Sequence, residues 1–200
     1  MTDAGGHSVR DMGVRGFQLV LLRRMADTRP DLVDDARRVL DASRTEMREA
    51  NRRWQAFTRA ARAPRGVRRY ALPLGPPARV RDVAVGDLVC RAHHWPLPLW
   101  PELVFEVVTV AGGGVVQEWL VRDDGGAPPP LRTLADLAPW SCVVDDVVRA
   151  FPDARPLEGD APSRWRLAFT ALAGDGGRPV PAVADFTWGL LQRVTVPTAP

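Results

Sequence analysis

The chain has 200 residues, a hydrophobic fraction of 46% and a formal net charge of +3, so it is long enough to bury a core and has an ordinary globular composition. All 27 basic residues are arginine, and lysine and isoleucine do not occur, which indicates a coding bias rather than a binding function. Two distant cysteines exclude a disulfide framework, and no apolar run is long enough for a signal peptide or a membrane span. We therefore expect a cytoplasmic protein with no membrane contact.

The charges are unevenly distributed along the chain. Residues 52–81 hold nine arginines and no acid, whereas residues 123–160 hold eight acids and three arginines. This pattern allows an acidic partner for the basic stretch. It also allows the two stretches to face each other within the fold or between two copies of the chain.

The first predicted elements are helical. Residues 1–12 are polar and predict a flexible tail, and the apolar face of residues 13–27 predicts a helix. Residues 31–63 contain no glycine or proline, and small or apolar side chains recur there at alternating steps of four and three: Ala36, Leu40, Ser43, Met47, Ala50, Trp54, Phe57 and Ala61. This heptad seam over residues 36–61 predicts one long helix with coiled-coil packing. It packs either on residues 13–27, as a helical hairpin over residues 13–70, or on a second copy.

The end of this helix is strongly basic, with Arg52, Arg53, Arg59, Arg62, Arg65, Arg68 and Arg69. Arginine near a helix C-terminus complements the helix dipole, but seven exceed what capping needs. Trp54, Phe57 and Tyr70 interleave with them, a composition that suits phosphate contact plus base stacking. Because Trp54 and Phe57 also belong to the seam, burial of these rings is the other interpretation. Residues 72–77 predict a linker.

From residue 78 onwards the pattern predicts strands. Segments 80–83 and 88–91 flank a Gly-Asp turn, segments 102–110 and 115–121 flank three glycines, and segment 140–144 predicts a closing strand. These segments predict a small barrel over residues 78–144. Residues 145–151 predict one or two helical turns, residues 152–162 a loop and segment 165–172 a strand. Segments 180–186 and 190–196 predict one or two more strands. The C-terminal part, 145–200, is expected to form a β extension packed on the barrel, which gives an α+β fold overall.

Residues 83–89 (VAVGDLV), the aromatic loop after them, two consecutive strands and a short return that ends at Trp140 together resemble an SH3-like or Tudor-like small barrel over residues 79–144. This resemblance implies a binding module rather than an enzyme. It implies that loop 92–101 is a contact surface, with Trp95 and Trp100 as its contact residues, beside Leu97 and Leu99. Three prolines stiffen this loop. In the other interpretation, the same four side chains cover an open end of the barrel.

One cluster has the residue types of a metal or thiol site: Cys90, His93 and His94, with Cys142 as a distant fourth ligand. If the strand continues through His94, Cys90 and His94 share a face but lie roughly 13 Å apart, and His93 points to the opposite face. This spacing disfavours both a local metal chelate and a Cys-His dyad. We expect no bound cofactor.

The sequence therefore predicts a non-catalytic binding or scaffolding protein that acts through protein–protein contacts, at the 36–61 seam and at the Trp95–Trp100 loop. The first alternative is a nucleic-acid-binding accessory protein that uses the arginines of residues 52–69. The second alternative is a metal-dependent or thiol enzyme that uses the Cys/His cluster.

Overall fold

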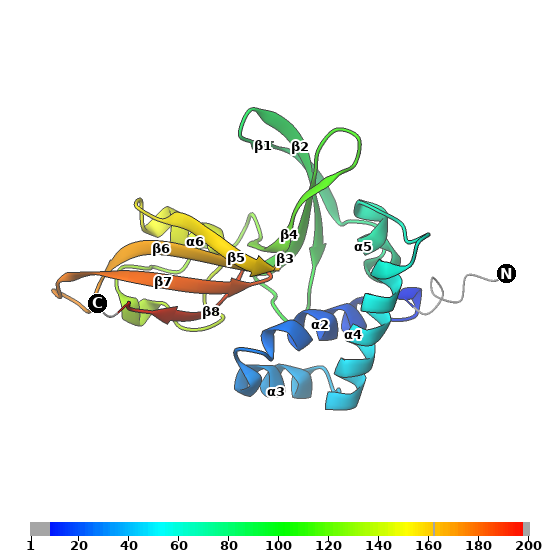
Figure 1. Ribbon diagram of the computed structural model, residues 1–200, viewed down its shortest axis with the longest axis horizontal. Coiled ribbons are helices and arrows are strands. Elements are labelled where there is room, and N and C mark those ends of the chain that lie inside the picture. The colour runs from blue at the N-terminus through cyan, green and yellow to red at the C-terminus, as the bar shows by residue number, and fades with distance from the viewer. Residues whose placement is uncertain (1–8, 162, 198–200) are drawn as a thin grey trace. The chain divides into compact units, whose positions relative to one another are not determined.

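The computed structural model describes residues 9–161 and 163–197, without the side chains of residues 159 and 160. Most of the predicted tail, residues 1–8, lies outside this range. The α+β class is confirmed, because helices come first and two four-stranded antiparallel sheets follow (Figure 1). The chain divides into two compact units, Met1–Glu118 and Trp119–Pro200, and each is described by itself. The predicted division into segments 13–70, 78–144 and 145–200 stays a prediction.

The helical region before the first sheet comprises α2 (Gly13–Met25), α3 (Pro30–Val39), α4 (Arg44–Arg59) and α5 (Val67–Leu74). The second half of the predicted seam is buried in α4, at Met47, Ala50, Trp54 and Phe57. The Phe17 ring of α2 meets the Trp54 ring edge-on, with ring centroids 5.4 Å apart. These four seam positions therefore pack inside this unit, whereas Ser43 and Ala61 are exposed. Self-association through the seam stays a prediction and would have to compete with this packing.

The prediction of one continuous helix over residues 31–63 is wrong, because the chain breaks between α3 and α4. Asp41 has a positive φ of 47°, which a right-handed helix cannot contain. Ser43 then caps α4: its Oγ accepts from the Glu46 amide at 3.1 Å, and its own amide donates to Glu46 Oε2 at 2.7 Å. This reciprocal capping box starts a new helix where the seam pattern alone predicts continuation. The long helix that the predicted coiled coil requires is therefore replaced by two shorter helices, α3 and α4.

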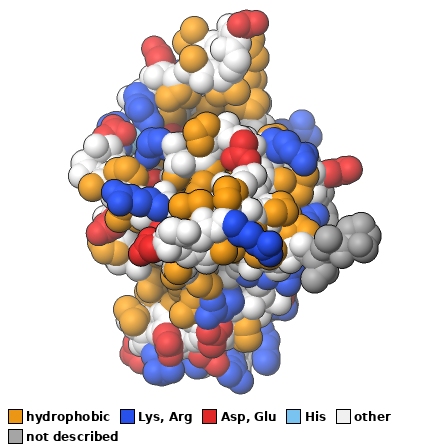
Figure 2. Space-filling view, turned by 90° about the vertical axis from the view of Figure 1, so that its left-hand side faces the viewer, with side chains coloured by type: hydrophobic (Ala, Val, Ile, Leu, Met, Phe, Trp, Pro, Cys, Tyr) orange, Lys and Arg blue, Asp and Glu red, His pale blue; other side chains and the backbone are white. Residues whose placement is uncertain are grey.

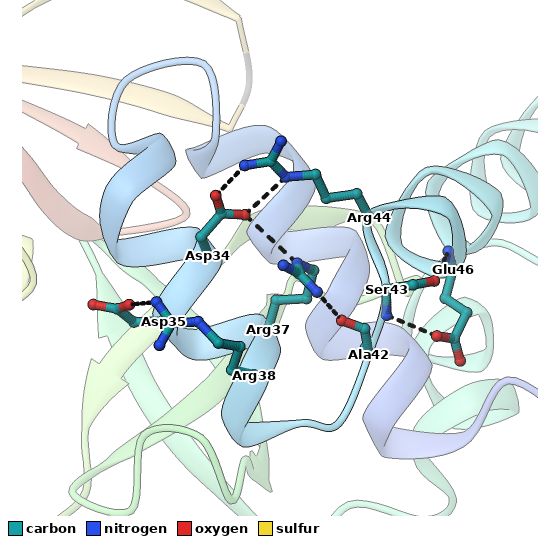
Figure 3. Close-up of polar contacts among 8 residues, drawn as sticks. All are labelled: Asp34, Asp35, Arg37, Arg38, Ala42, Ser43, Arg44 and Glu46. Atoms are coloured by element: carbon teal, nitrogen blue, oxygen red, sulfur yellow. Dashed lines mark hydrogen bonds and ion pairs between the residues drawn. The ribbon is translucent and has the colours of Figure 1, made fainter.

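Side chains on both sides of the break hold the turn in place (Figure 3). Arg37 of α3 donates to the carbonyl of Ala42, which lies between the two helices. Asp34 of α3 accepts from Arg44 at the start of α4, at 3.1 Å from its Nε. These contacts join the end of one helix to the beginning of the next. They need residues at specific positions around the turn, which a seven-residue periodicity does not encode.

The predicted linker at residues 72–77 is also wrong in its first half. Residues 72–74 form the last turn of α5, and the helix ends where Gly75 takes a φ of 76°. Pro73 lies inside this short helix. Only residues 75–78 remain as a connection to the first strand.

The first sheet has the order β1 (Arg79–Val85), β2 (Leu88–Pro96), β3 (Leu103–Thr109), β4 (Val115–Arg122). Strands β1, β3 and β4 and the turns at 86–87 and 111–114 match the prediction. Strand β2 continues to Pro96, so the first five residues of the predicted loop 92–101 are strand instead. The closed barrel and the SH3-like or Tudor-like resemblance are wrong, because within the described residues the sheet is open, with β1 and β4 at opposite edges. The predicted closing strand at 140–144 forms only a single bridge, Val143 to Leu190, before a helix begins.

The two faces of this sheet have different environments. Trp95 and Phe105 are paired neighbours on one face, and the Phe105 ring contacts the rings of Phe17 and Tyr70 at centroid distances of 5.0 and 5.5 Å. That face therefore packs on the helices. The opposite face carries a small apolar cluster of Cys90, Ala92 and Val108, with the buried polar residues His94 and Glu106 next along the strands.

The second unit contains a 3₁₀ turn, η1 (Leu134–Asp136), the helix α6 (Val144–Ala150) and a sheet in the order β5 (Arg155–Ala161), β6 (Arg164–Leu172), β7 (Pro179–Thr187), β8 (Leu190–Thr195). The helix and the last three strands were predicted. The loop predicted at 152–162 is wrong, because most of it is β5. A proline, a glycine and several charged residues hide this strand in the sequence. The Phe151 ring at the end of α6 packs on Phe169 of β6, with centroids 4.7 Å apart.

Candidate functional site

The side chains predicted for the aromatic loop are packed into the first unit, with Trp95 in strand β2 and the others in the connection between β2 and β3. Trp95 and Leu97 are 2% and 1% exposed, and Trp100 is 8% exposed, while Leu99 is only half-buried. The Trp95 indole donates to the Gly75 carbonyl at 3.0 Å, and the Leu99 amide donates to Gln18 Oε1 of α2 at 2.8 Å. In this arrangement the loop joins the sheet to the helices. A role for these side chains in binding a partner stays a prediction, and it would require the loop to leave its packing.

His94 belongs to a buried polar network that spans all four strands of the first sheet. His94 Nε2 lies 2.7 Å from Glu106 Oε2, and both residues are almost fully buried. Gln117 donates to the other Glu106 oxygen at 2.9 Å, and the Arg81 guanidinium lies 3.7 Å from the same carboxylate. Arg79 approaches His94 Nδ1 at 3.1–3.2 Å.

The contact with Arg79 determines which ring nitrogen of His94 carries the proton. A guanidinium has only donors, so His94 Nδ1 must accept from Arg79 and the ring proton must be on Nε2, where it donates to Glu106. Both ring nitrogens are therefore occupied. A general base needs a nitrogen free to take a proton from a substrate, so His94 in this arrangement positions β1, β2 and β3 rather than acting as a base.

The three predicted metal ligands of the first unit do not converge on one point, and a metal site that includes Cys142 stays a prediction. Cys90 faces the apolar cluster with Ala92 and Val108, and His93 Nε2 lies 3.3 Å from Thr109 Oγ1. Cys142 belongs to the second unit. Among residues 9–161 and 163–197, no group of three or more Cys, His, Asp or Glu side chains is placed to hold a metal ion. The helices in this range also include none with the length and apolarity to cross a membrane.

Cys142 is held in its neutral form by its surroundings. It is 1% exposed, and burial raises the pKa of its thiol to about 12. At pH 8 roughly one thiol in ten thousand is then ionised, and only the thiolate is an effective nucleophile. This environment suits a core side chain.

We expect Cys142 in a Cys90→Ala variant to resist an aromatic disulfide reagent at pH 8 in the native state and to react fully in denaturant. The variant keeps a small apolar side chain at position 90, so absorbance reports Cys142 alone. Rapid stoichiometric labelling of the folded protein would contradict the burial described above.

A second polar contact in the interior joins α5 to β4. The Tyr70 hydroxyl donates to Glu118, and Tyr70 is 2% exposed. Burial raises the pKa of Glu118, and the nearby positive charge of Arg69 lowers it by a smaller amount. The Arg69 Nε is buried and has no hydrogen-bond acceptor among the described residues. Arg69 is thus half-buried, whereas the other six arginines of the predicted basic stretch are exposed.

The raised pKa of Glu118 predicts a pH dependence of stability. The folded chain binds the Glu118 proton more tightly than the unfolded chain, whose glutamate titrates near pH 4.3, so this contribution is complete below that pH. It declines as pH rises through the higher folded value. We expect the free energy of unfolding of Glu118→Gln, measured by urea titration from pH 4 to 8, to lack this decline while the Tyr70 hydrogen bond is kept. Parallel pH profiles of the two proteins would contradict the assignment.

The exposed arginines of the basic stretch divide into two groups. Arg52 and Arg53 both donate to Glu49, at 2.7–2.9 Å. Glu49 consequently has its pKa lowered to about 2. The other four, Arg59, Arg62, Arg65 and Arg68, lie at the end of α4, in the connection and in the first turn of α5.

A buried ion pair joins β4 to α6 in the second unit. Arg122 Nη2 lies 2.8 Å from Asp146 Oδ2, and Asp146 is 2% exposed. The same carboxylate accepts from the Val143 amide at 3.1 Å and so caps α6. Figure 2 shows arginine, acidic and hydrophobic side chains mixed on the face turned to the viewer. The second unit also contains exposed ion pairs. One example is Asp185, which bridges Arg166 and Arg193 across three strands.

Sequence reasoning missed Glu106, Gln117 and Glu118 as buried or half-buried polar residues. All three lie in strands whose remaining residues are mostly apolar, and the single acid in the VFEVV stretch was a usable signal. A charged side chain in the middle of a buried strand needs a hydrogen-bonding or oppositely charged partner. The stretch that precedes this strand contains His94, which can be that partner. The pairing itself depends on strand register, which places His94 opposite Glu106.

No family model matches the chain, and no curated protein matches it. A search of solved structures finds a crystal structure from Streptococcus mutans described as a "putative beta-lactamase inhibitor protein". The match covers 73% of this chain and 95% of that chain, with 9% sequence identity and a TM-score of 0.28. A likeness of this degree assigns neither a family nor a function to the present chain.

Proposed function

We propose that this chain is a non-catalytic binding protein that acts through contacts with another protein. The observation that carries this proposal is the way its chemically versatile side chains are used. His94 has both nitrogens occupied, and Cys142 is buried as a neutral thiol. Glu106 is buried in contact with His94 and Gln117, and Asp146 is buried in an ion pair with Arg122. These groups stabilise the fold, so the exposed surface is what remains for function.

Nucleic-acid binding is the second candidate, favoured by the absence of acids from residues 52–81. Burial of the neighbouring aromatic rings argues against base stacking, one of the two kinds of contact expected for nucleic-acid binding. Trp54, Phe57 and Tyr70 are 5%, 5% and 2% exposed and pack on one another, so they offer no face on which a base could stack. Contact with phosphates alone would remain.

The proposal is tested by affinity purification of the tagged chain from its native host, with and without nuclease, followed by mass spectrometry. We expect a protein partner that is retained after nuclease treatment. The captured protein, once purified, is expected to form a stoichiometric complex with the chain in calorimetry. Loss of every captured protein on nuclease treatment would favour the nucleic-acid alternative. A chain that captures nothing and is monomeric by light scattering would contradict both.

A further inference from the structure

Four arginines recur at every third position from the end of α4 to the first turn of α5: Arg59, Arg62, Arg65 and Arg68. All four are exposed, and the sequence has no acid between Glu49 and Asp82. In the part of the chain that the structure describes, none of the four forms a hydrogen bond or ion pair with a carboxylate. We name these four residues the arginine surface. In Figure 1 the connection that carries its middle part projects away from the strands of the first unit.

Many other helical arginines of this unit pair with an acid, although Arg24 of α2 and Arg48 of α4 form no ion pair among the described residues. Arg52 and Arg53 pair with Glu49, Arg38 pairs with Asp35, and Arg44 pairs with Asp34 across the helix break. Pairing with a neighbouring acid is thus common on α3 and α4, with Arg48 as an exception. The arginine surface differs because four arginines in succession along the chain lack such a partner among the described residues.

Helix stability does not account for the arginine surface either. Arg59 lies in the last turn of α4, where a positive charge is favourable to the helix dipole. Arg68 lies in the first turn of α5 and Arg65 just before it, where a positive charge is unfavourable. That end of α5 has no capping side chain and no acid in its first turn. Helix capping therefore explains one of the four charges and leaves the other three without a structural function in the chain by itself.

We propose that the arginine surface binds a carboxylate-rich segment of a partner protein. This inference rests on the proposed function and names the contact surface and the chemistry of the partner. The guanidinium fork matches a carboxylate with two parallel hydrogen bonds. The chain makes this contact internally, where Arg52 Nε and Nη2 donate to the two Glu49 oxygens at 2.9 and 2.7 Å. Because the neighbouring aromatic rings are buried, the surface offers charge without stacking, which fits carboxylates better than exposed bases.

The test uses the full chain and a fluorescein-labelled octaglutamate peptide, with binding measured by anisotropy at low and at physiological salt. The variant Arg62→Gln/Arg65→Gln removes two charges from the connection, outside both helices. The matched control Arg52→Gln/Arg53→Gln also removes two charges, both of which are paired with the Glu49 carboxylate. We expect the first variant to weaken binding about fivefold or more and the control less than about twofold, with all binding weakened by salt. Circular dichroism confirms that both variants fold.

Three outcomes would overturn the inference. The native chain could fail to bind the peptide at low salt, both variants could lose affinity equally, or a labelled duplex DNA could bind more tightly than the peptide at equal salt. The proposed function is separable from these outcomes. If Arg62→Gln/Arg65→Gln still captures the native partner as well as the unchanged chain does, the binding function stands and the arginine surface is not its contact site.

Discussion

Replacing Asp146 with alanine is expected to lower the free energy of unfolding of the second unit by about 3–5 kcal/mol. The carboxylate is 2% exposed and accepts from Arg122 at 2.8 Å and from the Val143 amide at 3.1 Å. Its loss leaves a guanidinium with little access to water and an uncapped α6 at the same time. The variant bears both costs together, because the same carboxylate pairs with Arg122 and caps α6.

The measurement is urea unfolding followed by circular dichroism, with Asp145→Asn as the control. Asp145 is the neighbouring acid in the first turn of α6, but it is exposed. We expect its replacement to cost less than about 1 kcal/mol, since water screens the interactions of an exposed charge. Similar losses in the two variants would show that the Arg122 pair is not a major source of stability.

Replacing Phe105 with alanine is expected to destabilise the first unit by about 3–5 kcal/mol. The ring is fully buried in β3 and contacts Phe17 of α2 and Tyr70 of α5 at centroid distances of 5.0 and 5.5 Å. It is therefore the point at which the sheet and two helices meet. Removing it leaves a cavity lined by rigid rings that cannot easily move to fill it.

Thermal unfolding with near-ultraviolet circular dichroism measures this effect, since the signal reports packing of the aromatic cluster. Val116→Ala serves as the control, because Val116 lies in strand β4 of the same sheet and is 50% exposed. We expect the control to remain within about 0.5 kcal/mol of the unchanged chain. A Phe105→Ala protein with the same midpoint as the control would mean that the helices and the sheet are held together elsewhere.

Local elements could be predicted where the pattern is local. The Val85–Leu88 turn, the β3 and β4 strands around three glycines, and the hairpin of β6 and β7 all follow from β-branched or aromatic runs bounded by glycine. The helix break at residues 40–43 was missed, although Ser43 and Glu46 have the spacing of a capping box. The apolar repeat on either side was the stronger signal, and it continues in register across the break. Strand β5 was missed because it carries a proline, a glycine and three charged residues in seven positions.

Only the residue types of the candidate site could be predicted from the sequence. The sequence shows that the arginines at 59–68 have no acid close to them along the chain, and among the described residues this holds in the fold for the four exposed ones. It cannot show that Trp54, Phe57 and Tyr70 face inward, since an aromatic ring beside an arginine fits a binding surface and a core equally well. Burial depends on which helix lies opposite, and that is a long-range property.

Residues 90–101 (CRAHHWPLPLWP) show which features follow from the local sequence and which depend on long-range contacts. A strand followed by a proline-stiffened connection could be inferred from the sequence, since β-branched residues and proline restrict the backbone locally. The positions of the side chains depend on the fold: His94 is paired with Glu106, Cys90 faces an apolar cluster, and Trp95 and Trp100 are buried. Those outcomes depend on strand register and on α2 and α5 covering one face of the sheet. The contacts join residues far apart in the chain, and no local pattern encodes them.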